Sequence, residues 1–109
     1  MATDALPMRL RAQALADGGV QVRVLMRHDM ETGQRRGEDG ARVPRRHIHT
    51  VTVWLNDAVA LRAQWGPGVA RDPFMQFTLP SAKVGDAVRL RWEDTAGESR
   101  SAQTAVVAA

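Results

Sequence analysis

The chain has 109 residues, of which 44% are hydrophobic and 25% are charged, a balance typical of one soluble globular domain rather than a disordered chain. We therefore assign residues 1–109 to a single domain. The absence of cysteine excludes disulfides, cysteine-ligated zinc, iron–sulfur clusters and cysteine nucleophiles. The net charge is +3, and no run of 18 apolar residues predicts a transmembrane helix.

Apolar and polar residues alternate with a period of two along most of the chain, which predicts antiparallel strands with one buried face. In chain order, the predicted strands lie at 8–12, 20–26, 50–55, 59–63, 75–79 and 88–92, with a less regular seventh at 99–107. Turn sequences such as Asp17-Gly18-Gly19 and Gly66-Pro67-Gly68 separate them. About seven short strands at this spacing, with no helical stretch between them, predict an all-β sandwich of two antiparallel sheets.

Residues 29–46 interrupt this pattern with a long segment that is rich in arginine and contains four glycines or prolines. A loop of this length inside a compact domain is uncommon and is typically functional or disordered. Between residues 35 and 46, five arginines face only two carboxylates, so this stretch alone carries a charge of +3. The basic character of the chain is thus concentrated in one segment.

All three histidines, His28, His47 and His49, lie in or beside this loop. On a strand, His47 and His49 would point to the same face and, with Asp29 or Glu31, could form a metal site. Histidines exposed at the end of a strand are the simpler interpretation. A stand-alone histidine-based metal-binding β-sandwich is therefore the alternative function for this chain.

The arginine-rich loop could also contact nucleic acid, but it contains no aromatic residue on which a base could stack. A solvated loop or a protein-docking surface is favoured, because arginine is enriched at protein interfaces. The sequence contains no nucleophile elbow, no phosphate-binding glycine loop and no zinc-protease histidine motif. We therefore expect no enzyme, no catalytic residue, no bound cofactor and no metal.

Two segments, HDMETGQR from His28 to Arg35 and GARVP from Gly40 to Pro44, resemble the SoxZ family of thiosulfate oxidation proteins. The resemblance continues in order over nearly the whole chain, at Ile48, Asn56, Asp72-Pro73-Phe74, Phe77, Trp92, Asp94 and Gly97. The chain departs from the family pattern at two places. Asp57 follows Asn56 where a glycine is often found, and Arg71 precedes Asp72-Pro73 where Asn-Pro is common.

This resemblance implies an immunoglobulin-like β-sandwich that pairs with SoxY to form the SoxYZ carrier of periplasmic sulfur oxidation. In that complex, a C-terminal cysteine arm of SoxY carries the sulfur intermediates and presents them to SoxAX, SoxB and SoxCD. The chain would then be the scaffold subunit. The residues agree on one point, because a chain without cysteine cannot carry the intermediates by thiol chemistry.

For the partner contacts, we expect an apolar and aromatic patch with Trp54 or Trp65 against SoxY, and an arginine-rich surface on the loop. The expected partner-binding residues are His28, Met30, Glu31, Arg35, Arg36, Arg45, Arg46, Trp54 and Trp65. An isolated subunit with an exposed apolar interface could also form a homodimer.

The N-terminal sequence lacks the basic and apolar regions of a secretory signal. Read alone, this predicts a cytoplasmic protein. The family resemblance instead implies export together with SoxY, whose signal serves both chains, so we expect a periplasmic location.

Overall fold

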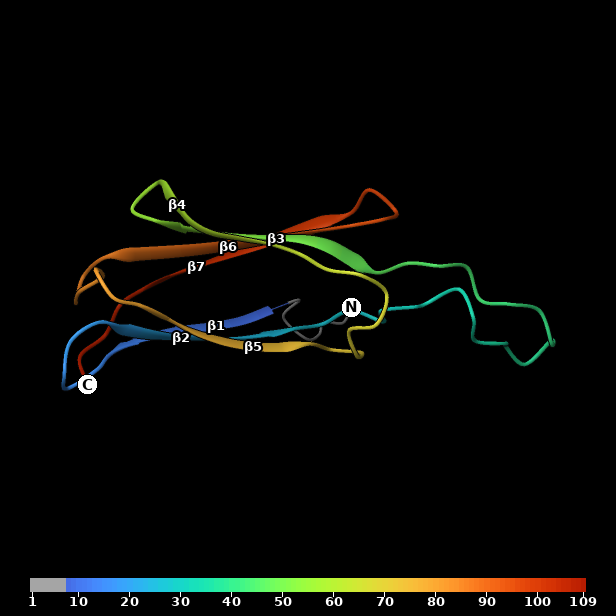
Figure 1. The fold of residues 1–109 in the computed structure, drawn as a ribbon, viewed down its shortest axis with the longest axis horizontal. Helices are drawn as coiled ribbons and strands as arrows, with labels where there is room; N and C mark the ends of the chain where they lie inside the picture. Colours follow the sequence, from blue (N-terminus) through green and yellow to red (C-terminus); the bar gives the residue numbers. More distant parts are fainter. Residues whose placement is uncertain (1–7) are drawn as a thin grey trace, which may run out of the picture.

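The computed structural model describes residues 8–109, which form seven antiparallel strands in two layers (Figure 1). The strands are β1 (Met8–Ala14), β2 (Val20–Met26), β3 (Ile48–Leu55), β4 (Ala58–Gln64), β5 (Phe74–Leu79), β6 (Ala87–Asp94) and β7 (Ser99–Ala105). The predicted all-β fold is confirmed, with a three-stranded sheet β1-β2-β5 and a four-stranded sheet β4-β3-β6-β7. No helix in residues 8–109 is long and apolar enough to cross a membrane.

The strand boundaries differ from the sequence prediction mainly in β3 and β7. β3 begins at Ile48, ahead of the regular alternation, and its register against β6 shifts between Ile48 and Thr50. That irregularity disrupts the period of two on which the prediction depended. β7 ends at Ala105, and Val107 forms only an isolated parallel bridge with Gln13 of β1.

The hydrophobic core lies between the two sheets and is built from the inward-facing alternate residues of each strand. Its fully buried side chains include Val20, Val22, Val24 and Met26 of β2, Val51 and Val53 of β3, and Val88 and Leu90 of β6. Complete burial of branched side chains such as these contributes about 1.5–3 kcal/mol each in transfer free energy. The strongest alternation in the sequence therefore marks the three strands that hold the layers together.

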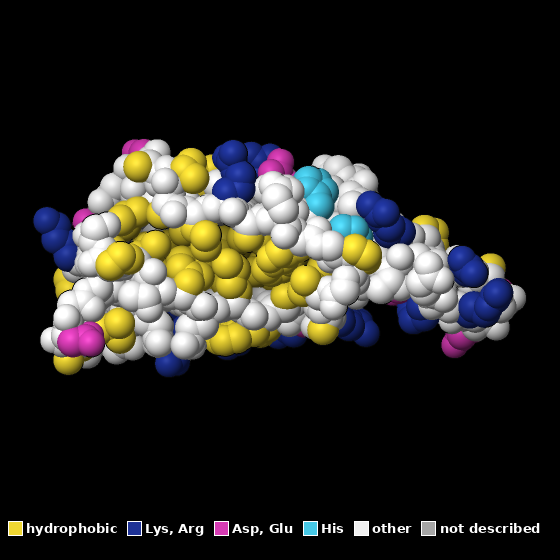
Figure 2. Space-filling view, viewed as in Figure 1, with side chains coloured by type: hydrophobic (Ala, Val, Ile, Leu, Met, Phe, Trp, Pro, Cys, Tyr) yellow, Lys and Arg dark blue, Asp and Glu magenta, His cyan; other side chains and the backbone are white. Residues whose placement is uncertain are grey.

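The sandwich is closed along one side and open along the other. Between the two sheets, β1 and β7 make the most extensive contact. Along the opposite side, the apolar residues of β4 and β5 are only partly buried, and we call this surface the open side. It consists of Leu61, Ala63, Trp65, Met75 and Phe77. Figure 2 shows a band of apolar side chains between the two layers.

Candidate functional site

Residues 29–46 form an irregular two-legged hairpin, which we call the arm and which extends beyond the end of the sandwich (Figure 1). At its base, the backbones of Glu31 and Arg46 exchange two hydrogen bonds of 2.7 and 2.9 Å. Further out, the Val43 N–H donates to the Arg35 carbonyl (2.7 Å). The predicted long loop therefore has a defined path even though it contains no strand.

Side chains from three separate segments fasten the base of the arm to the sandwich: His28 and Asp94, which are buried, and Arg46, which is half-buried. Asp94 lies at the end of β6, and each of its two carboxylate oxygens accepts two hydrogen bonds. One accepts from the backbone N–H groups of Ala96 and Glu98 (2.9 Å each). The other accepts from His28 Nε2 (2.9 Å) and Arg46 Nε (3.2 Å). Asp94 thus ties the first residue before the arm to the last residue of the arm.

The contacts of His28 fix which ring nitrogen carries its proton. The Met30 backbone N–H donates to Nδ1 (3.0 Å), so Nδ1 acts as an acceptor and the hydrogen sits on Nε2, which faces Asp94. The ring also meets Trp92 edge-on, with ring centroids 5.0 Å apart. On the backbone side, the His28 N–H donates to the Asp72 carboxylate (3.0 Å). His28 is therefore an anchor that is fully engaged within the protein.

The carboxyl group of Asp94 has a lowered pKa, although its environment acts in both directions. Burial favours the neutral acid and would raise the pKa. The hydrogen bonds from His28, from the Glu98 backbone, from Arg46 and from the Ala96 backbone stabilise the carboxylate and outweigh burial. Asp94 is thus a buried anion at neutral pH.

Two backbone features shape the arm where it leaves the sheet. Met30 adopts a left-handed conformation (φ 54°) and buries its side chain, whose sulfur accepts a hydrogen bond from the Ile48 N–H (3.4 Å). Gly33 is also left-handed (φ 88°), and a Cβ atom there would lie 3.1 Å from the Cβ of Arg45 on the opposite leg. The close approach of the two legs therefore requires a glycine at position 33.

The arginines of the arm fall into two groups. Arg35 pairs with Glu31 (2.7 Å), and Arg46 pairs with Asp94 and Glu98, so both are used to hold the arm itself. Within residues 8–109, no carboxylate pairs with Arg36, Arg42 or Arg45. All three residues are exposed, and Arg36 Nη1 donates a hydrogen bond to the Gly40 carbonyl (2.8 Å). Because no carboxylate there neutralises them, the three positive charges remain available to a partner.

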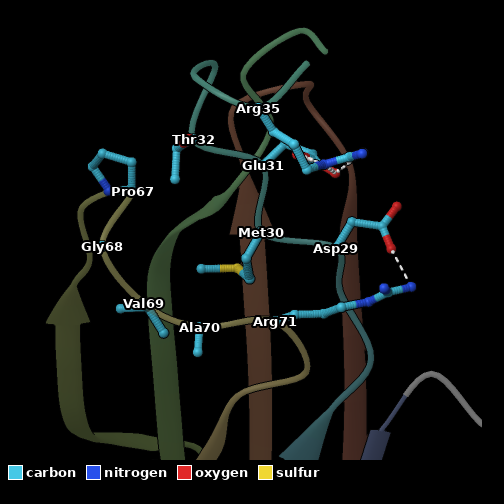
Figure 3. A pocket seen from close by; sticks show the side chains of 10 residues that line it. All are labelled: Asp29, Met30, Glu31, Thr32, Arg35, Pro67, Gly68, Val69, Ala70 and Arg71. Atoms are coloured by element: carbon cyan, nitrogen blue, oxygen red, sulfur yellow. Dashed lines mark hydrogen bonds and ion pairs between the residues drawn. The ribbon is translucent and has the colours of Figure 1, made fainter. Parts of the chain in front are cut away.

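A cavity of about 550 Å³ lies between the base of the arm and the segment that joins β4 to β5 (Figure 3). It is lined by two acidic and two basic side chains, which pair with each other. Arg35 pairs with Glu31, and Arg71 lies 3.5 Å from Asp29. Because its charges are already matched, the cavity offers no unpaired charge to a charged ligand.

The structure does not gather the histidines into a metal site, contrary to the alternative hypothesis. Among residues 8–109, no group of three or more histidine or acidic side chains could hold a metal ion. His47 precedes β3, is buried, and places Nδ1 2.9 Å from the Ile48 carbonyl oxygen. His49 places Nδ1 2.7 Å from the Thr50 hydroxyl. The strand geometry on which the predicted shared face depends does not extend over both residues, because β3 starts after His47 and its register shifts between Ile48 and Thr50.

The two tryptophans that we expected at a partner interface lie in different environments. Trp54 is half-buried on the outer face of the four-stranded sheet, under the guanidinium group of Arg89 at 4.0 Å. Trp65 follows β4 and packs against the core at the open side. One contiguous patch therefore does not contain both, and Trp65 is the one that lies beside other partly buried apolar residues.

A family model described as "Sulphur oxidation protein SoxZ" matches residues 8–105. The chain belongs to the SoxZ family. Comparison with curated proteins gives no match. The SoxZ motif residues His28, Met30, Ile48, Asp72, Trp92 and Asp94 are those that build the base of the arm. In this chain, these residues therefore have a structural role, and membership in the family connects the chain with sulfur oxidation.

Sequence reasoning did not detect the contribution of Asp72 and Asp94 to this site. Asp94 lies 66 positions from His28, and no local pattern predicts that the two side chains meet. It also did not single out Arg9, Arg11 and Arg23, which share the outer face of the three-stranded sheet. Their signal was present in the sequence, since all three occupy the polar positions of alternating strands.

Proposed function

We propose that this SoxZ chain is the scaffold subunit of a SoxYZ carrier complex in periplasmic thiosulfate oxidation. In this proposal, SoxY supplies the cysteine arm that carries the sulfur intermediates, and SoxZ supplies a docking platform without chemistry of its own. Family membership is the observation that carries the proposal. The complete absence of cysteine supports it, because a scaffold without thiols cannot compete with the arm for the sulfur cargo.

The open side is the surface that we assign to SoxY. It presents Leu61, Ala63, Trp65, Met75 and Phe77 between two edge strands, β4 and β5, and all five are only partly buried. Stable interfaces have an apolar centre enriched in aromatic residues and methionine. β1 and β7 cover the core along one side of the sandwich. A partner that covers the open side would complete the burial of the core along the other.

The arm is the surface that we assign to transient contacts with SoxAX, SoxB and SoxCD. Arg36, Arg42 and Arg45 form no ion pair within residues 8–109, so their guanidinium groups can attract carboxylates on these enzymes and accelerate their encounter with the carrier. A carrier that must release each enzyme benefits from fast electrostatic association without a large apolar contact.

Native mass spectrometry of this chain co-expressed with a SoxY subunit from the same organism tests the proposal. The expected result is a 1:1 heterodimer that carries sulfur adducts only on SoxY. Separation of the periplasmic fraction from the same cells tests the location, and both chains should appear there together. A chain that stays alone or pairs with itself while SoxY folds without it would contradict the proposal.

Two substitutions on β4 test the assignment of the open side. Leu61→Ser removes a partly buried apolar side chain from that side, whereas Val59→Ser changes a 54% exposed residue opposite Trp54 on the outer face of the same strand. We expect Leu61→Ser to weaken the heterodimer by about fivefold or more, since deletion of an apolar side chain from an interface centre costs about 1–3 kcal/mol. Val59→Ser should leave the affinity within about twofold.

Circular dichroism of both variants checks that each remains folded, and titration calorimetry measures the affinity for SoxY. Equal affinities of the two variants would show that SoxY binds elsewhere on the sandwich.

A further inference from the structure

We propose that the outer face of the β1-β2-β5 sheet is a second docking surface, and that it binds an acidic protein surface from which an apolar side chain projects. We call it the basic face, and it consists of Arg9, Arg11, Arg23, Leu25 and Phe74. This sheet is the lower layer in Figure 1. The inference goes beyond the proposed SoxYZ function and does not depend on it, since neither the open side nor the arm belongs to this face.

The strand register arranges these side chains in two adjacent rows. In one row, Arg9 of β1 lies opposite Leu25 of β2, which lies opposite Phe74 of β5. In the next row, Arg11 lies opposite Arg23. Because alternate residues of a strand point to the same side, all five side chains project outward from one sheet. Two apolar residues are thus bordered by three cations.

The charge on this face is not balanced by carboxylates among residues 8–109. Strands β1, β2 and β5 contain three arginines and neither aspartate nor glutamate, which gives the sheet a charge of +3. In the part of the chain that the structure describes, no carboxylate forms an ion pair with Arg9, Arg11 or Arg23. Arg11 and Arg23 are also direct cross-strand neighbours, an arrangement of like charges that destabilises a sheet. An acidic partner would relieve this repulsion.

The apolar part of the face indicates a protein as the partner. Phe74 is 61% exposed although it is a large aromatic residue. Beside it lies a shallow cavity of about 170 Å³, lined by Arg9, Arg11, Arg23, Val24, Leu25 and Phe74. Arginine and phenylalanine are enriched at protein interfaces, and arginine can bind carboxylates through two parallel hydrogen bonds. A projecting apolar side chain would enter the cavity while flanking carboxylates pair with the guanidinium groups.

The test is an NMR titration of the ¹⁵N-labelled full chain at low ionic strength. The probe is a capped peptide with one phenylalanine between two pairs of glutamates. We expect saturable shifts centred on Leu25, Phe74 and the side-chain N–H groups of the three arginines. A peptide with glutamines in place of the glutamates should produce much smaller shifts, because the charge pairing is lost.

Three variants localise the binding. Replacement of Arg9, Arg11 and Arg23 by glutamine should weaken binding of the acidic peptide roughly tenfold or more. The matched triple variant Arg36→Gln, Arg42→Gln and Arg45→Gln removes the same charge from the arm and should change the affinity less than about twofold, since exposed charges far from the site are screened. Phe74→Thr keeps a residue suited to a strand and should also weaken binding.

Four results of the peptide titrations would overturn the inference. They are shifts confined to the arm, an equal loss of affinity in both triple variants, equal binding of the neutral peptide, and the absence of saturable shifts. A short oligothymidylate that binds the basic face more tightly than the acidic peptide would also overturn it, in favour of nucleic acid. Because none of these readouts involves SoxY, failure here is distinguishable from failure of the heterodimer.

Discussion

Asp94 determines how the arm is attached, because each of its two oxygens accepts two N–H donors in a buried position. Such a carboxylate is stable only while all its partners are present. It joins His28 before the arm, Arg46 at its end and the backbone turn after β6. One residue therefore couples three segments that are distant in sequence.

Asp94→Asn should lower the free energy of unfolding by about 2–4 kcal/mol. Whichever way the asparagine amide is turned, its NH₂ group faces two N–H donors in place of an acceptor. Asp29→Asn is the matched control, since Asp29 is 58% exposed and lies 3.5 Å from Arg71 at the surface. We expect it to change stability by less than about 1 kcal/mol. Urea denaturation measures both, and equal losses would contradict the anchoring role of Asp94.

The difference in stability between wild type and Asp94→Asn should depend on pH, because the pKa of Asp94 is lowered in the folded protein. A carboxyl group whose pKa is lower in the folded state contributes stability above its unfolded pKa of about 3.9, and this contribution disappears as the pH falls through the folded pKa. The difference in stability between wild type and Asp94→Asn should therefore be full at pH 5–7 and shrink below about pH 4. Parallel curves at all pH values would show that Asp94 does not titrate in this way.

At the scale of strands, the sequence predicts what depends on local periodicity and misses what depends on long-range contact. The alternation in β2 and β6 identifies buried residues such as Val22 and Leu90 correctly. It fails at Ile48, where the register shift against β6 places the start of β3 outside the regular pattern. The contact between His28 and Asp94 had no local signal, so the arm was recognisable as a long loop but its anchor was not.

The cross-strand pair of Arg11 and Arg23 gives a prediction for the three-stranded sheet. Arg23→Gln should raise the free energy of unfolding by about 0.2–0.5 kcal/mol, because it removes a like-charge repulsion. For a domain of this size, that corresponds to an increase in melting temperature of about 1–3 °C. The gain should shrink at high salt.

Arg62→Gln on β4 is the control for this prediction, since Arg62 lies opposite the uncharged Thr52. It should produce no comparable gain in a thermal unfolding experiment. A loss of stability in Arg23→Gln would show that Arg23 makes a favourable contact on the face. A gain would mean that the protein retains an unfavourable pair there, as expected of a surface kept for binding.

At the scale of the whole molecule, the surfaces that we assign to partners point in different directions. The open side offers apolar area, the basic face combines arginines with an apolar centre, and the arm extends isolated charges away from the sandwich. These surfaces suit different kinds of contact. Apolar area favours a lasting subunit interface, whereas isolated exposed charges mainly affect how fast partners meet.

This division predicts a kinetic effect of the arm. In the SoxYZ heterodimer that we propose, replacing Arg36, Arg42 and Arg45 by glutamine should slow association with SoxB, one of the proposed transient partners, about tenfold at low ionic strength and much less at high salt. Glu38→Gln with Asp39→Asn removes the negative charges from the same arm and should speed association. Arg35 and Arg46, which hold the base of the arm, remain in place, so any change in stability should be limited to the loss of the exposed hydrogen bond from Arg36 to the Gly40 carbonyl. Stopped-flow measurements over a range of salt concentrations provide the rates. Rates that respond to neither substitution would show that the arm does not steer the encounter, and its anchored base would then need another explanation.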